Sequence, residues 1–170
     1  MLKLSALMLC VLLQMGVAHA DDVAVKKDVE VTLLQLKVSK RAQTEVLEPV
    51  VQIKPGEVIE YQVSYHNTTK RPISQLQATL PIPKETEYIP NTANPAVVQA
   101  SLDGVNYAPI PLRHVVKLAN GQMTEQDVPV VEYRSLRWSL GDLSANQKKT
   151  VSARVRLAPI GLAGAGGVKK

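Results

Sequence analysis

Alternation of apolar and polar residues is the dominant pattern of the chain, and it predicts strands rather than helices. In residues 55–69 a Pro-Gly turn leads into a stretch where Tyr61, Val63 and Tyr65 share one face. A period of two, with aromatic and β-branched residues on one side, is typical of a half-buried strand. The opposite, polar face of this strand carries Glu60, Gln62, Ser64 and His66.

The same pattern recurs near the end of the chain. In residues 148–157 the apolar Val151, Ala153, Val155 and Leu157 alternate with polar and basic residues. Residues 128–140 predict the preceding strand, with Leu136, Trp138 and Leu140 on one face, and further strands are predicted at 73–82 and 86–89. Short strands separated by turns, without a segment of helical period after residue 20, predict an all-β fold, an antiparallel β-sandwich of about seven strands.

Four segments carry a less regular signal. Residues 29–38 alternate, but the apolar parity switches at Leu34, which predicts a β-bulge or a strand that crosses between sheets. Pro49 makes residues 46–53 an edge strand or a loop. Asp103-Gly104 predicts a tight hairpin between residues 96–102 and 105–110, whereas residues 113–127 fit a loop or a short hairpin around Asn120-Gly121.

The first twenty residues predict a cleaved signal peptide. Lys3 precedes an apolar run at 4–17, and Ala18-His19-Ala20 has the small-x-small pattern of a cleavage site. The alternative is a lipoprotein signal at Cys10, although Leu9 stands where a small residue is expected. We therefore expect export to the periplasm or the extracellular space, a flexible lead-in at 21–28, a sandwich domain at 29–158 and a disordered Gly/Ala-rich tail at 159–170.

The net charge and the few reactive residues limit which catalytic, metal-binding and nucleic-acid-binding functions are expected. The 170 residues carry 20 basic and 15 acidic side chains, and cleavage after Ala20 would remove Lys3 and Cys10, which leaves a net charge of +4 and no thiol. The remaining histidines, His66 and His114, lie in separate segments, so neither an oriented nucleophile nor a copper site with Met123 is expected. Basic pairs fall at predicted turns without interleaved aromatic residues, which argues against nucleic acid as a partner. We expect no catalytic residue, no cofactor, no metal site and no membrane span after cleavage.

Three groups of motifs resemble a known family. They are Pro55-Gly56-Glu57 followed by Tyr61-Gln62-Val63 and Asn67-Thr68, then Leu80-Pro81-Ile82-Pro83 with Tyr88-Ile89-Pro90-Asn91-Thr92-Ala93, and Trp138-Ser139-Leu140-Gly141-Asp142-Leu143 before Thr150-Val151. As a set, over residues 29–157, they resemble the conserved repeat domain, the domain of unknown function eleven. The resemblance implies an immunoglobulin-like sandwich of exported bacterial and archaeal proteins. The chain departs from the family in having a single copy, and in having Ala145-Asn146 where a Pro-Gly turn is usual.

These observations favour a non-enzymatic, extracytoplasmic binding or assembly module of the cell envelope, as a monomer or weak oligomer. The expected partner is another envelope or surface protein, or an anionic envelope polymer. The expected contact surface is the 113–127 segment together with an outward basic ladder of Arg137, Arg154 and Arg156, which requires the last two long strands to pair. Two alternatives remain: a fibre or surface-structure subunit that assembles by strand pairing, and a periplasmic carrier of a metal or small ligand.

Overall fold

A computed structural model of the protein describes residues 28–158. The expected signal peptide, the lead-in up to residue 27 and the tail from residue 159 lie outside the described residues. The elements are β1 (Val29–Arg41), β2 (Thr44–Pro49), β3 (Val58–Asn67), β4 (Ile73–Pro81), β5 (Thr86–Tyr88), β6 (Gln99–Ser101), β7 (Ala108–Pro109), β8 (Arg113–Lys117), β9 (Met123–Asp127), the 3-10 turn η1 (Val130–Glu132), β10 (Ser135–Leu143) and β11 (Lys148–Leu157). The all-β prediction is confirmed, but the strand number of about seven was too low, because strands of two or three residues leave no alternation to detect.

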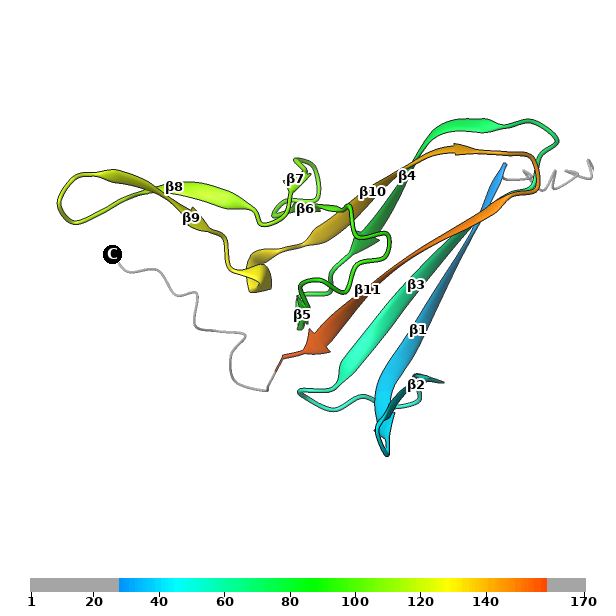
Figure 1. Ribbon diagram of the computed structural model, residues 1–170, viewed down its shortest axis with the longest axis horizontal. Coiled ribbons are helices and arrows are strands. Elements are labelled where there is room, and N and C mark those ends of the chain that lie inside the picture. The colour runs from blue at the N-terminus through cyan, green and yellow to red at the C-terminus, as the bar shows by residue number, and fades with distance from the viewer. Residues whose placement is uncertain (1–27, 159–170) are drawn as a thin grey trace, which may run out of the picture.

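Two antiparallel sheets form the two layers of the molecule (Figure 1). One has five strands in the order β2-β1-β3-β11-β5, and the other has four in the order β4-β10-β6-β7. The central strand of the five-stranded sheet is β3, which is the strand that the 55–69 pattern predicts. Its inner face (Ile59, Tyr61, Val63, Tyr65) and that of β11 (Val151, Ala153, Val155) are buried, as the alternation predicts.

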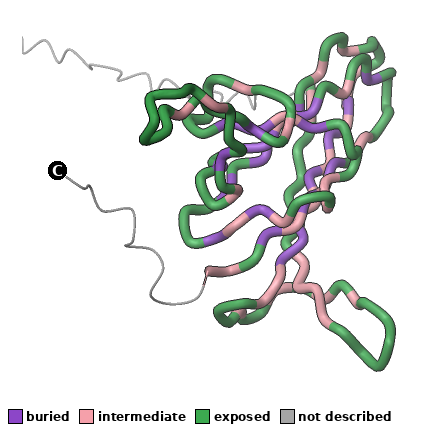
Figure 2. Tube along the Cα trace, turned by 60° about the vertical axis from the view of Figure 1, so that its left-hand side comes forward, coloured by how far each residue is buried: buried purple, intermediate pink, exposed green. Residues whose placement is uncertain are grey.

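The buried residues lie mainly on strands of the two facing sheets (Figure 2). Trp138 of β10 is the largest fully buried side chain among them. Trp138 and Leu136 are buried, and the indole Nε1 donates a hydrogen bond to the carbonyl of Pro95 at 2.8 Å. From the four-stranded sheet Ala78, Leu80 and Ala100 complete the facing layer. The strand predicted from residue 128 begins only at Ser135, because Val130–Glu132 turns as η1.

No bulge or crossing interrupts β1, so that part of the prediction was wrong. It pairs with β3 in one continuous register, from Val29 opposite Asn67 to Val38 opposite Val58. The parity switch at Leu34 has another origin: β1 carries apolar side chains on both faces. Val31 and Leu33 share the face of the buried Tyr65 and Val63, whereas Leu34 lies on the outer face.

Both hairpin predictions are confirmed in outline. β6 and β7 pair on either side of Asp103-Gly104, but the connection is a six-residue loop, not the tight turn that we expected. The carboxylate of Asp103 accepts hydrogen bonds from the N–H groups of Val105 and Asn106, which holds the longer loop open. β8 and β9 form the short hairpin considered for 113–127, and it projects from the body of the molecule (Figure 1).

The side chain of Asn67 joins the two sheets at the end of β3. It is fully buried, and its Nδ2 group donates to the carbonyls of Arg71, Leu143 and Ser144 at 2.7–3.1 Å. Its Oδ1 accepts from the N–H and the hydroxyl of Thr69. One amide thus fixes the turn after β3 to the turn between β10 and β11. In that second turn Asn146 has a φ of 58°, as expected where Asn replaces a Pro-Gly turn.

We expect Asn67→Ala to lower the free energy of unfolding by about 2–4 kcal/mol, because buried carbonyls lose their donor without gaining water. Urea denaturation monitored by tryptophan fluorescence measures this. Asn120→Ala, at an exposed turn, is the matched control and should change stability by less than about 0.5 kcal/mol. Equal losses in the two variants would contradict a structural role for the Asn67 amide.

Candidate interaction surface

The three predicted contact arginines do not form a ladder. Arg137 lies on β10 in the four-stranded sheet, whereas Arg154 and Arg156 lie on β11 in the five-stranded sheet, so the strands that had to pair belong to opposite layers. The prediction was wrong because the Ser144–Gln147 turn carries the chain from one sheet to the other, a geometry that strand periodicity does not reveal. Of the three, only Arg156 is exposed.

Internal partners occupy the other two arginines. The guanidinium of Arg137 stacks 4.0 Å from the ring centroid of Tyr107 and donates to Gln99 Oε1. Arg154 donates through Nε to Glu60 Oε2 at 2.8 Å and through Nη1 to Glu45 Oε2 at 2.9 Å. These hydrogen bonds, that to Glu60 above all, raise the pKa of Arg154. Arg154 therefore links β11 to β3 and β2, and its charge is largely neutralised.

A different surface lies along β1, which is an internal strand for only half of its length. β2 pairs with β1 from Leu36 to Arg41, and the N–H of Val50 extends this contact to the carbonyl of Gln35. On the other side, the carbonyl of Asp28 accepts from Thr68 and so faces β3. Backbone groups alternate in direction along a strand, so those of Val29, Val31 and Leu33 face away from β3. Within residues 28–158 no strand pairs with them there. We call Val29–Gln35 the free edge of β1.

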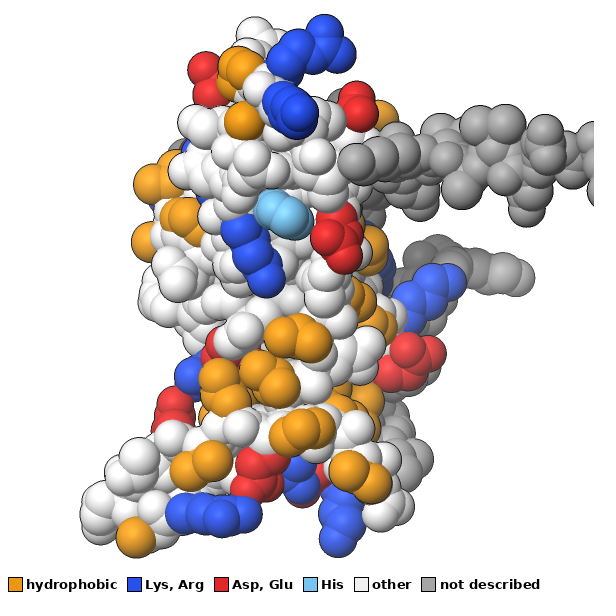
Figure 3. Space-filling view, turned by 90° about the vertical axis from the view of Figure 1, so that its right-hand side faces the viewer, with side chains coloured by type: hydrophobic (Ala, Val, Ile, Leu, Met, Phe, Trp, Pro, Cys, Tyr) orange, Lys and Arg blue, Asp and Glu red, His pale blue; other side chains and the backbone are white. Residues whose placement is uncertain are grey.

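Apolar side chains flank the free edge on both faces. Val31 and Leu33 point to the core side but are 56% and 49% exposed, since the four-stranded sheet ends at β4 and does not cover β1. On the outer face Leu34 is 49% exposed and continues into Leu36 and Val38. Leu47 and Pro49 of β2 lie opposite these last two residues. Seen from the side of the five-stranded sheet, hydrophobic side chains gather in the lower half of the face (Figure 3).

The other long edge of the sandwich, β4, is blocked. Gln75 has a φ of 56°, which breaks the extended backbone, and Pro81 has no N–H to offer. Between them, the N–H of Thr79 donates to the hydroxyl of Tyr65 at 3.3 Å instead of to an added strand. Burial raises the pKa of this tyrosine, an effect that the hydrogen bond from Thr79 opposes. A left-handed residue, a proline and an occupied donor are all devices that stop strand addition.

The remaining edges are short or charged. β5 and β7 have three and two residues, and β7 contains Pro109. β2 ends at Pro49 and carries two glutamates, and the projecting β8–β9 hairpin has the ion pairs of Arg113 with Glu125 and Asp127. Short, charged or proline-containing edges resist pairing with another chain. Among the described strands, the free edge of β1 is the one that combines length, unpaired backbone groups and apolar flanks.

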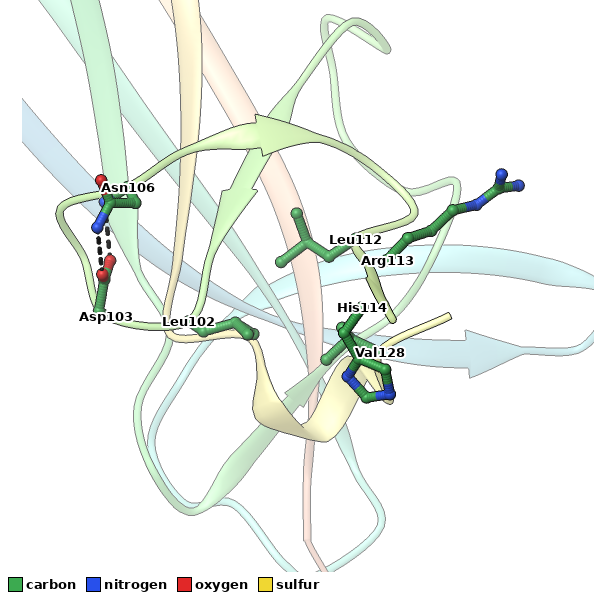
Figure 4. Close-up of a pocket in the computed structure, with 7 residues that line it drawn as sticks. All are labelled: Leu102, Asp103, Asn106, Leu112, Arg113, His114 and Val128. Atoms are coloured by element: carbon green, nitrogen blue, oxygen red, sulfur yellow. Dashed lines mark hydrogen bonds between the residues drawn. The ribbon is translucent and has the colours of Figure 1, made fainter. Parts of the chain in front are cut away.

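A hollow of about 220 Å³ brings several polar side chains together at the base of the β8–β9 hairpin (Figure 4). Asp103 and Asn106 lie on one side of it, and His114 lies beside Val128 on the other. Four donors already surround the Asp103 carboxylate: the N–H groups of Asn106 and Val105, the Asn106 amide and the Ser101 hydroxyl. This carboxylate therefore serves as the acceptor that shapes the loop between β6 and β7.

Two further features were sought among the described residues: a cluster of metal-ligating side chains and a membrane-spanning helix. Nowhere in residues 28–158 do three or more His, Cys, Asp or Glu side chains come together in a way that could hold a metal ion. His66 lies 3.4 Å from Glu30 on the outer face of the five-stranded sheet, and His114 lies in another sheet. The same part of the chain contains no helix long and apolar enough to span a membrane.

The sequence reasoning missed Val31, Leu33 and Leu34 as surface residues, although their signal was present. Apolar residues of both parities in one strand have two explanations: both faces are buried, or apolar side chains on at least one face are exposed to solvent. The switch at Leu34 predicts a bulge or a crossing, but a strand left uncovered by the opposite layer gives the same pattern. Only the position of β4 decides between these possibilities.

Replacing Arg154 with Met should lower the free energy of unfolding by about 1–2 kcal/mol, because Glu60, which is largely buried, loses its charged donor. Arg156→Met on the same strand removes an exposed charge and should change stability by less than about 0.5 kcal/mol. Chemical denaturation of both variants checks this. A smaller effect for Arg154 than for Arg156 would rule out the bridging role.

The melting temperature should fall at acid pH partly through Asp103. The surrounding donors, with the N–H of Asn106 first, hold the pKa of its carboxyl well below the usual range. A lowered pKa in the folded state stabilises the protein above the ordinary aspartate pKa, and this stabilisation is lost as the pH falls toward the lowered value. In Asp103→Asn the decline in melting temperature below about pH 4 should be shallower. Asp142→Asn is the control, and an unchanged slope in Asp103→Asn would contradict this assignment.

The fold and its surfaces can be compared with known proteins. No known protein-family model, curated protein or solved structure matches the chain. The resemblance to the conserved repeat domain, and the immunoglobulin-like strand order that it implies, stay predictions.

Proposed function

We propose that the protein is a non-enzymatic assembly module of the cell envelope, which binds a partner by accepting an added strand along the free edge of β1. The observation that carries the proposal is the combination at this edge of unpaired backbone groups and uncovered apolar side chains. An extended segment laid there would receive hydrogen bonds from Val29, Val31 and Leu33, and would cover the apolar side chains beside them.

The blocked edges elsewhere support this choice. Proteins usually protect exposed edges, since an open edge is a template for pairing with other chains. Here β4 carries three such devices, whereas Val29–Gln35 has no proline, no lysine and no left-handed residue. An open edge in a sandwich whose other edges are protected is the pattern expected where pairing is the function.

The free edge of β1 replaces the basic ladder and the 113–127 segment as the expected contact surface. The basic ladder does not exist, and the β8–β9 hairpin carries its own ion pairs, so the argument for those two surfaces is weaker than for β1. Export to the periplasm or the extracellular space rests on the sequence of residues 1–20. An envelope location fits a module without catalytic machinery, whose partners are other envelope or surface proteins.

Site-specific photocrosslinking in producing cells tests the proposal. A benzophenone amino acid at Thr32, exposed on the open edge strand, should form adducts in several-fold higher yield than the same group at Thr79. Thr79 is the matched control: it is also an exposed threonine on an edge strand, but its edge is blocked.

A proline substitution at the free edge distinguishes binding by strand pairing from binding through other contacts. Leu33→Pro removes a donor that faces away from β3, so it should abolish the Thr32 adducts and leave the circular dichroism spectrum unchanged. Equal yields at Thr32 and Thr79, or adducts that persist in the proline variant, would exclude the free edge as the binding surface.

A further inference from the structure

We infer that the strand accepted by the free edge of β1 is the same edge of a second copy of the chain, in an antiparallel pair centred on Val31. This inference rests on the proposed function and names its partner. It would join two five-stranded sheets into one continuous sheet about a two-fold axis, the commonest symmetry of soluble dimers.

The directions of the backbone groups determine the register. Outward-facing groups belong to Val29, Val31 and Leu33, so residues of this odd-numbered set must lie opposite one another. With the axis at Val31, Val31 lies opposite its own copy and Val29 lies opposite Leu33. Each of the three outward-facing residues then exchanges two hydrogen bonds with its counterpart, and the pairing leaves none of their donors or acceptors unused.

Neighbouring symmetric registers fail for specific reasons. An axis at Thr32 would place Val29 opposite Gln35, whose carbonyl already accepts from Val50. An axis at residue 30 would bring two Glu30 carboxylates face to face and would leave Leu33 without a partner in 29–35. Like charges directly opposite one another in a sheet are destabilising. Of these three centres, Val31 is therefore the one that uses the outward-facing groups of Val29, Val31 and Leu33 together.

Side chains agree with this register. On the core side, Val29, Val31 and Leu33 of both copies would lie together, which covers the two residues that the four-stranded sheet leaves exposed. On the outer face Glu30 would lie opposite Thr32, and Asp28 opposite Leu34, so that no like charges face each other. Aliphatic pairs across neighbouring strands are favourable, and β-branched valine suits a sheet.

The contact is small, so the dimer should be weak. Three residues per copy exchange hydrogen bonds, and interfaces below about 1,200 Å² belong to transient complexes. Sedimentation velocity of the purified protein from about 1 µM to about 1 mM covers the affinities expected for such a contact. We expect a reversible monomer–dimer equilibrium in this range.

Charge exchange at the two-fold axis tests the register. Val31→Lys and Val31→Glu each place two like charges opposite one another and should each weaken dimerisation by about tenfold. Mixing the two variants places opposite charges there and should restore association. Val105→Lys, at a valine 76% exposed in the loop before β7, is the control and should leave the equilibrium unchanged.

Hydrogen exchange tests the same register without substitution. As the concentration of the wild-type protein rises, the amides of Val29, Val31 and Leu33 should become protected, whereas those of Glu30, Thr32 and Leu34 are protected by β3 at every concentration.

The outcomes of these experiments distinguish failure of the dimer from failure of the proposed function. A wild-type protein that stays monomeric overturns the inference, and the proposed function survives this result if the Thr32 crosslinks contain a different protein. A dimer that tolerates Val31→Lys overturns the β1 contact. Failure of the mixed variants to associate overturns the axis at Val31, and absent crosslinks at Thr32 in a monomeric protein would overturn both proposals.

Discussion

The sandwich is wider on one side than on the other, and this mismatch determines its surface chemistry. The five-stranded sheet extends past β3 to β1 and β2, whereas the facing sheet ends at β4. The apolar side chains on the inner face of β3, and Val151, Ala153 and Val155 of β11, are therefore covered, whereas those of Val31 and Leu33 are not. Removing apolar area from water stabilises at roughly 25 cal/mol per Å², so covering these two residues would be favourable. Tyr65, which lies opposite Val31, reaches the edge of β4 with its hydroxyl because of the same mismatch. There the hydroxyl accepts the N–H of Thr79 and so blocks the β4 edge.

Only half of β1 stays open because β2 pairs with it from Leu36 to Arg41 alone, and ion pairs surround this paired half. Lys37 contacts Glu57 at 2.6 Å, Arg41 contacts Glu48, and Arg154 ties Glu45 of β2 to the body of the sheet. Each exposed pair contributes little, about 0–1 kcal/mol. The pairs of Glu48 and Glu45 help to hold β2 in place, whereas the Lys37–Glu57 pair joins β1 to the turn before β3. The hydrogen bond from Lys37, followed by that from the N–H of Lys54, also lowers the pKa of Glu57. The β1–β2 hairpin is held in register over the second half of β1. Val29–Gln35, in the first half, is extended and paired with β3, so it has little conformational entropy to lose when another strand pairs with it.

Much of the fold follows from the sequence, because the long strands alternate apolar and polar residues with a period of two. β3 and β11 are buried on one face and polar on the other, so their alternation reports their environment directly. Asp103-Gly104 and Asn120-Gly121 mark hairpins because few residues adopt positive φ without strain. The positions of β5, β6 and β7 could not be read, since two or three residues do not make a period. The buried amide of Asn67 was visible only as part of a motif, because its five hydrogen bonds join segments separated by up to 77 residues.

The candidate site was harder to predict because it depends on which strands are neighbours. Arg137 and Arg154 look equivalent along the chain, yet a four-residue turn places them in different sheets, and local pattern contains no information on that crossing. The free edge of β1 poses the reverse problem: its signal, apolar residues of both parities, is plain in residues 29–38 but has several structural meanings. A strand buried on both faces gives the same pattern, as does a bulged one. What separates them is the absence of a described strand opposite Val29, Val31 and Leu33, a property of the whole arrangement and not of the segment itself. Surfaces that work through backbone pairing are therefore poorly marked in a sequence, because the groups that bind are common to every residue.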